Sequence, residues 1–172
     1  MSRSDARRHS FTLIFQFPFH KNMDVETLAW LKALYYDCLN EIPSGSRTIS
    51  EGSPQGVDMS AVADAPIGPR PKGRDDEYIN RVVWGTLEKQ TQLDGVIENF
   101  LKEWTVDRIN RVDLALMRLA IYEMLCEPDV PFGVAVNEAV ELAKVYGTDD
   151  SPAFINGVLG NVAREIKGVG RE

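Results

Sequence analysis

The clearest hydrophobic pattern lies in the C-terminal half of the chain. Residues 107–126 are apolar on nearly every side of a helix, with only isolated charged residues between them. A helix without a polar face must be covered by other helices unless it lies in a membrane. This segment is too short and too charged to span a bilayer. The pattern therefore predicts a central helix over 107–126 in a helical bundle.

A second helix is predicted between Pro131 and Gly147. Apolar residues recur there at spacings of three and four, which gives one buried stripe. A proline costs no hydrogen bond at the start of a helix, and glycine is the usual residue of a left-handed C-terminal cap. We therefore expect the helix to begin at the proline and Gly147 to adopt the left-handed conformation.

The last helix is predicted to start at Ser151 and Pro152, as an N-cap followed by a proline in the first turn. Its apolar stripe runs along 155–166. Gly157 and Gly160 flank this stripe, although glycine lowers helix propensity. We expect these two glycines to let a neighbouring helix approach closely.

The remaining helices are predicted from the same periodicity. They cover residues 4–17, 25–40, 75–90 and 93–104. No segment has the alternating pattern of a strand. We therefore predict an all-α fold of about seven helices in two sub-bundles.

A long segment separates the two sub-bundles. Residues 43–73 hold five of the nine prolines and five of the thirteen glycines, a composition that cannot bury a core. The 172 residues are enough for one domain. We predict that domain to comprise N-terminal helices in 1–41, a flexible insertion in 42–73 and C-terminal helices in 74–168.

The cysteines and the N-terminus indicate a cytoplasmic protein. Cys38 and Cys126 lie in helical patterns without metal-ligand spacing, which favours buried thiols over a disulfide. The apolar run after His9 is interrupted by Gln16, Pro18 and His20, so no signal peptide is recognisable. We expect no membrane association.

Catalytic motifs are absent from the sequence. The two histidines, His9 and His20, form no metal-binding pair. Glu138 and Glu141 share a helix face, but no histidine or aspartate recurs at ligand spacing, so a solvated surface is the better interpretation. We predict a binding protein with no enzymatic activity, no cofactor and no metal.

Positive charge is concentrated at the N-terminus of an acidic chain. The net charge is −7, yet the first nine residues contain Arg3, Arg7, Arg8 and His9 against Asp5 alone. Cations at a helix N-terminus are disfavoured by about 0.3 kcal/mol or more, and residues four apart share a helix face. The cluster fits an anionic ligand such as RNA, and a solvated helix start is the open alternative.

Four phrases follow one another in order within the C-terminal half, and the arginine-bearing first helix precedes them. The phrases are residues 113–123, 129–131, 136–144 and 146–159. Together they resemble the bacterial NusB family of transcription antitermination factors. The resemblance covers nearly the whole chain except residues 42–73.

The resemblance implies a function in transcription. Proteins of this family pair with NusE, a small-subunit ribosomal protein, and hold single-stranded boxA RNA within an antitermination complex on RNA polymerase. The resemblance therefore implies a role in suppressing termination, notably in ribosomal RNA operons. Single-stranded RNA is bound through phosphate contacts and through bases stacked on aromatic or guanidinium planes.

The resemblance also implies the site residues. The expected partner-binding residues are Asp107 and Asp113, which would face the basic NusE and for which a plain solvated face is the alternative. Phe154 is equally compatible with the edge of the core, and Asp150 with a helix-start charge. The expected RNA-binding residues are Arg3, Arg7, Arg8, Phe15, Asp150 and Phe154.

Two other functions remain open at this stage. One is the RNA-binding domain that precedes some RNA methyltransferases, which shares this helical module but would require a longer chain with a cofactor-binding fold. The other is a protein-binding helical adaptor or a homodimer without RNA contact, since the surface used for RNA could serve self-association.

Overall fold

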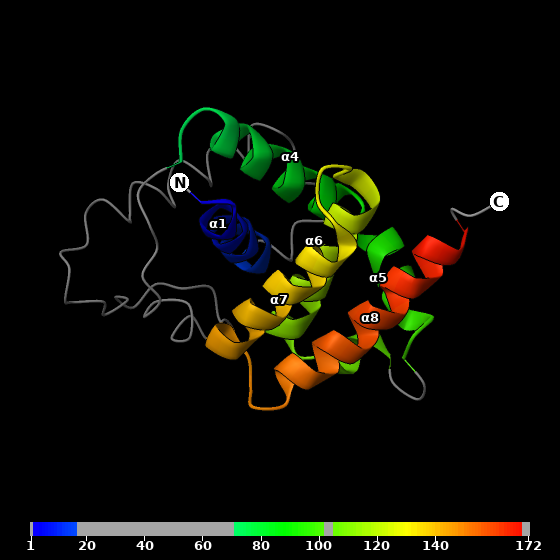
Figure 1. The fold of residues 1–172 in the computed structure, drawn as a ribbon. Coiled ribbons are helices and arrows are strands. Elements are labelled where there is room, and N and C mark those ends of the chain that lie inside the picture. Colours follow the sequence, from blue (N-terminus) through cyan, green and yellow to red (C-terminus); the bar gives the residue numbers. More distant parts are fainter. Residues whose placement is uncertain (1, 17–70, 102–104, 170–172) are drawn as a thin grey trace.

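The computed structural model describes residues 2–16, 71–101 and 105–169, and all regular structure in these ranges is helical (Figure 1). This confirms the predicted all-α fold. The predicted helix over 25–40 and most of the insertion lie outside the described residues. The described elements are α1 (Arg3–Gln16), α4 (Arg74–Glu88), α5 (Gln90–Glu98), the 3₁₀ turn η1 (Val106–Arg108), α6 (Arg111–Cys126), α7 (Phe132–Tyr146) and α8 (Ser151–Val169).

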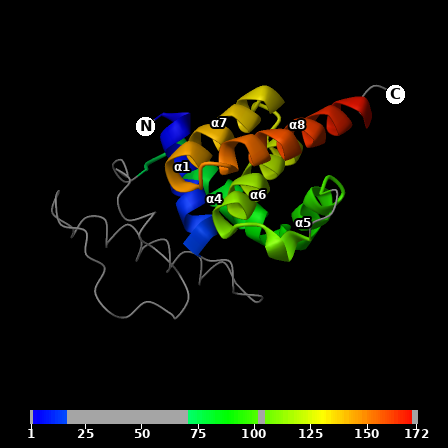
Figure 2. The same ribbon diagram turned by 90° about the horizontal axis from the view of Figure 1, so that it is seen from below.

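Helix α6 is the centre of the bundle, as predicted from its apolar surface. It contacts α1, α4, α5, α7 and α8, and it passes between them in both views (Figures 1 and 2). Leu116, Met117 and Ile121 on α6 are completely buried. Within the described ranges, no helix has the length and apolar character needed to cross a membrane.

The start of α6 differs from the prediction. The apolar pattern predicted a helix from Asp107, but α6 begins at Arg111 and the preceding residues form only the short turn η1. Asn110 is the N-cap, and its side-chain oxygen accepts the backbone amide of Val112 at 2.9 Å. An asparagine cap satisfies an otherwise unpaired amide, and this local preference sets the boundary that the apolar pattern missed.

Helix α5 is shorter than predicted. It begins at Gln90 and ends at Glu98, whereas the pattern suggested a helix over 93–104. Beyond Glu98 the hydrogen bonds span three residues, as in the 3.0 Å bond from the Phe100 amide to the Ile97 carbonyl. Such tightening is usual at a helix end.

Helices α7 and α8 form an antiparallel pair joined by a tight turn at Gly147 (Figure 1). The prediction of a left-handed cap is wrong, because Gly147 has φ −91° and ψ −170°. A Cβ atom at this position would lie 2.6 Å from both the Cβ and the Oγ of Ser151. Glycine is therefore needed for space rather than for backbone conformation.

The close helix approach lies at a different glycine from those expected. A Cβ atom at Gly157 or Gly160 would meet nothing within 4 Å, so the prediction for these two residues is wrong. Gly85 on α4 is the close contact instead. A Cβ atom there would lie 2.2 Å from the hydroxyl oxygen of Tyr122 on α6. This glycine lets α4 pack directly against the Tyr122 ring.

Helix α1 packs against α4, α6 and α7, so it shares one core with the helices that follow the insertion. The Phe11 ring centroid lies 5.0 Å from that of Tyr146 at the end of α7. The described part of the first predicted sub-bundle is therefore joined directly to the second.

Candidate nucleic-acid interface

Arg7 is buried at the junction of three helices. Its Nε donates to both carboxylate oxygens of Glu123 on α6, at 2.9 and 3.0 Å, and its Nη1 lies 3.5 Å from Glu138 on α7. Burial opposes the charge of Arg7, but the hydrogen bond and the charge of Glu123 outweigh it and raise the pKa of Arg7. With only 4% of its surface exposed, Arg7 is not available to a phosphate. The structure thus corrects the RNA-binding role expected for this residue.

Arg3 and Arg8 remain at the surface. Arg3 is exposed, and its guanidinium carbon lies 4.2 Å from the centre of the Tyr78 ring on α4. Arg8 is half-buried, with its Nη1 3.6 Å from Asp5. Of the three N-terminal arginines, these two keep part of their surface in contact with solvent.

The first turn of α1 is fixed by reciprocal hydrogen bonds between Ser2 and Asp5. The Ser2 hydroxyl oxygen accepts the Asp5 amide at 3.1 Å, while the Asp5 carboxylate accepts the Ser2 hydroxyl at 2.6 Å and the Ser2 amide at 3.2 Å. The hydrogen bond from the Ser2 side chain lowers the pKa of Asp5. This capping arrangement fixes the backbone of the turn that contains Arg3.

The expected RNA residues Asp150 and Phe154, at and just before the start of α8, lie at the other end of the α1–α7 pair. Arg7 contacts Glu138 while Phe11 contacts Tyr146, so α1 and α7 run in the same direction. Asp150, beyond the end of α7, is exposed, and Phe154 is half-buried against the core. A single ligand that reached both groups would have to follow α7.

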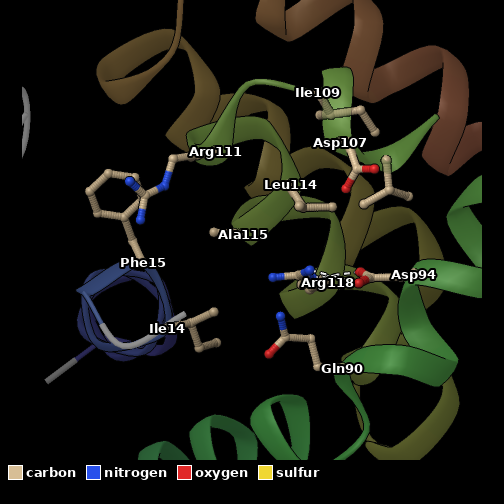
Figure 3. A pocket seen from close by; sticks show the side chains of 11 residues that line it. Ile14, Phe15, Gln90, Asp94, Asp107, Ile109, Arg111, Leu114, Ala115 and Arg118 are labelled. Carbon is tan, nitrogen blue, oxygen red and sulfur yellow. Dashed lines mark hydrogen bonds and ion pairs between the residues drawn. The ribbon is translucent and has the colours of Figure 1, made fainter. Parts of the chain in front are cut away.

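Phe15 lines a pocket of about 450 Å³ between α1, α5, η1 and α6 (Figure 3). Only 7% of its surface is exposed. Phe15 and Arg111 lie at the α1 side of the pocket, and exposed Asp107 lies at the η1 side. The pocket is lined by Ile14, Phe15, Gln90, Asp94, Val106, Asp107, Ile109, Arg111, Leu114, Ala115 and Arg118.

Arg118 forms an ion pair within the pocket. Arg118 donates from Nε and Nη2 to the two oxygens of Asp94 at 2.6 and 2.7 Å, a bidentate ion pair drawn as dashed lines in Figure 3. The sequence pattern did not predict this pocket. The signal was the seven-residue spacing of Arg111 and Arg118 on a largely apolar helix, which places both side chains on one face.

Asp113 is buried in this structure. It is 5% exposed, and burial raises the pKa of its carboxyl group, against a smaller opposing effect of a hydrogen bond from Ser151. The prediction that Asp113 lies on a partner surface is therefore wrong, because the side chain joins the start of α6 to the start of α8. Asp107 remains exposed.

Neither metal-binding nor histidine chemistry is indicated in the described ranges. No group of three His, Cys, Asp or Glu side chains there could hold a metal ion. His9 is buried in α1, and burial lowers its pKa to about 4. It is therefore neutral at physiological pH.

A model of the NusB family matches residues 59–164. The transcription antitermination protein NusB of Clostridium tetani is 36% identical over 96% of this chain and 100% of its own length. The chain belongs to the NusB family. NusB of Acetivibrio thermocellus is 56% identical over 52% of this chain, a match that spans 62% of that relative's length.

Solved structures have the same fold. T. maritima NusB superimposes with a TM-score of 0.68 at 27% identity, covering 96% of this chain and 92% of that one. The crystal structure of antitermination factors NusB and NusE in complex with dsRNA contains a similar chain, with a TM-score of 0.67 at 18% identity over 95% of this chain and 96% of that one. NusB proteins are transcription antitermination factors and not enzymes, which confirms the prediction of a non-enzymatic protein.

Proposed function

We propose that this protein binds single-stranded boxA RNA together with NusE, as part of an antitermination complex on RNA polymerase that supports ribosomal RNA transcription in the cytoplasm. Its membership of the NusB family supports the proposal. So does its similar fold to a NusB chain crystallised with NusE and dsRNA.

The observation that carries the RNA contact is the position of exposed Arg3 and half-buried Arg8 at one end of a chain with a net charge of −7. Phosphate contacts supply most of the sequence-independent affinity for nucleic acids. A small basic edge on an acidic protein binds RNA weakly by itself. A basic partner such as NusE would add positive charge to the complex and make the pair a better clamp.

The pocket beside Phe15 supports a protein contact on a second face. Exposed Asp107 at its rim offers negative charge to a basic partner, and complementary charge of this kind sets orientation and association rate. Phe154 and Asp150 are proposed to contact RNA near the start of α8. Stacking of a base on an aromatic side chain contributes about 1–3 kcal/mol.

The test is a titration of labelled boxA RNA with the protein at several salt concentrations, with and without NusE. Each phosphate contact to a single strand contributes about 0.7 to the log–log salt slope. The double variant R3A/R8A should therefore flatten the slope by about 1.4 units, whereas R164A on exposed α8 surface should not.

Two outcomes would contradict the proposal. Equal affinity for boxA and for a scrambled strand would remove the sequence preference. An RNA affinity that does not change when NusE is added would rule out joint binding. That result would favour a protein-binding adaptor or a homodimer. Light scattering would then distinguish the homodimer from a monomer. By linkage, RNA must strengthen the NusE contact by the same factor that NusE strengthens RNA binding.

A further inference from the structure

Three side chains from three helices form a chain of contacts that ends at the protein surface. Glu123 of α6 accepts the Tyr78 hydroxyl at 2.6 Å, and the Tyr78 ring of α4 lies 4.2 Å below the guanidinium carbon of Arg3 on α1. Tyr78 is 2% exposed, whereas Arg3 is exposed. A buried carboxylate thus fixes a ring, and the ring lies against a surface cation.

Glu123 has the partners it needs to keep the ring in place. Its two oxygens also accept hydrogen bonds from Arg7, so the carboxylate is compensated within the core. The Tyr78 hydroxyl therefore donates to a carboxylate whose charge is balanced by Arg7 and not by Arg3. In the part of the chain that the structure describes, Arg3 forms no ion pair, and its charge is left for a ligand.

The contact between Arg3 and Tyr78 is attractive for a physical reason. A guanidinium over an aromatic face is drawn to the negative side of the ring quadrupole. A phenol that donates its hydrogen to a carboxylate is polarised, which increases the electron density of the ring. The interaction with Glu123 therefore strengthens the attraction between the ring and Arg3.

We propose that Tyr78 is a positioning residue that holds the Arg3 guanidinium at the surface before RNA binds. The inference rests on the proposed function, because it assumes that Arg3 meets an RNA phosphate. A long arginine side chain loses conformational freedom when it binds, and a side chain that is already held loses less. Tyr78 itself is too deeply buried to contact RNA.

The first measurement examines the free protein. Protons above an aromatic ring resonate upfield, so the Arg3 Hε and Hδ signals should be shifted upfield in the proton NMR spectrum. Y78F keeps the ring and should keep the shift, whereas Y78L should abolish it. The R3A variant assigns the signals, and thermal unfolding shows whether each variant is folded at the temperature used.

The second measurement is the salt dependence of binding to boxA RNA in the presence of NusE. R3A should flatten the log–log slope by about 0.7, the contribution of one contact to a single strand. Y78L should flatten it by most of the same amount, and Y78F should leave it near the wild-type value. The double variant R3A/Y78L should lose no more than R3A, because both changes remove one contact. R164A is the matched control for the loss of a surface arginine.

The outcomes separate the inference from the function on which it rests. The positioning role is overturned if the upfield shift of the Arg3 signals persists in Y78L. It is also overturned if the salt slope of Y78L equals that of wild type while the slope of R3A is flattened. Either result leaves the RNA site intact. Additive losses in R3A/Y78L overturn it as well. A wild-type slope in R3A overturns the RNA contact of Arg3, and with it the inference.

Discussion

Arg7 and Glu123 are 116 residues apart in the sequence, yet the Arg7 Nε lies 2.9 Å from the Glu123 Oε1 in a buried ion pair. The pair joins the first helix of the chain to its central helix. Removal of one partner from a buried ion pair leaves an uncompensated charge in the core. The stability of the α1 surface therefore depends on a residue far along the chain.

The first prediction concerns this ion pair. E123Q should lower the free energy of unfolding by about 3–5 kcal/mol, because Arg7 would retain only the more distant carboxylate of Glu138. Urea unfolding followed by circular dichroism measures the change. The control is E141Q, which breaks the exposed ion pair with Lys144 and should cost less than about 1 kcal/mol. Similar losses in the two variants would contradict the structural role of the buried pair.

The second prediction compares two glycines. G85A should lower the free energy of unfolding by about 1–3 kcal/mol, since the added Cβ would overlap the Tyr122 ring. G157A meets nothing within 4 Å and lies inside α8. It should raise stability by about 0.5–1 kcal/mol, because alanine favours the helix. Thermal unfolding of both variants tests the packing of α4 on α6, and a G85A protein as stable as wild type would refute it.

The third prediction is a pH dependence that arises from His9. Its pKa is about 4 in the folded protein and near 6.5 in the unfolded chain, so the unfolded state binds more protons between these values. The contribution of His9 to the free energy of unfolding is therefore fully present above about pH 6.5. It decreases as the pH falls towards 4, by on the order of 3 kcal/mol in total.

The variant H9Q isolates this effect. The free energy of unfolding of wild type minus that of H9Q should fall as the pH is lowered from 7 to 4.5, measured by urea titration at each pH. The raised pKa of Asp113 acts in the opposite direction at acidic pH, but it is present in both proteins and cancels in the difference. A difference that does not vary with pH would show that His9 is protonated equally in both states.

The fourth prediction concerns Asp107 and Asp113, which were both expected from the sequence to bind the partner. D107K reverses an exposed charge at the rim of the pocket and should weaken NusE binding several-fold through lost charge complementarity. D113N keeps the shape of a buried side chain and should leave NusE affinity within about twofold. Calorimetric titration with NusE measures both, and a larger effect of D113N would restore the original expectation.

For the helices that the structure describes, the apolar periodicity predicted their positions well, because burial is the main determinant of where a helix lies. The stripe of α8 is an example, since Ile155, Leu159 and Val162 are all fully buried. The periodicity did not predict where helices begin, because boundaries depend on single polar groups. Asn110 starts α6 through one hydrogen bond, and the sequence around it is apolar enough to suggest a longer helix.

The candidate site was predicted less completely, because exposure depends on contacts between distant residues. Helical spacing places Arg3 and Arg7 on one face, but only the fold shows that Glu123 lies opposite Arg7 and leaves Arg3 at the surface. A usable signal was present, since a glutamate within a largely apolar helix requires a cationic or hydroxyl partner. The same reasoning would have suggested that Asp113 is buried.

The distance between Arg7 and Glu123 along the chain also sets an order of events during synthesis. At about 5–20 residues per second, roughly 6 to 23 s separate the appearance of α1 from that of its partner on α6. Tyr146, which packs against Phe11, is made later still. A nascent chain therefore carries its N-terminal arginines for some seconds without the scaffold that orients them. Their geometry is completed only when translation of the C-terminal helices is nearly finished.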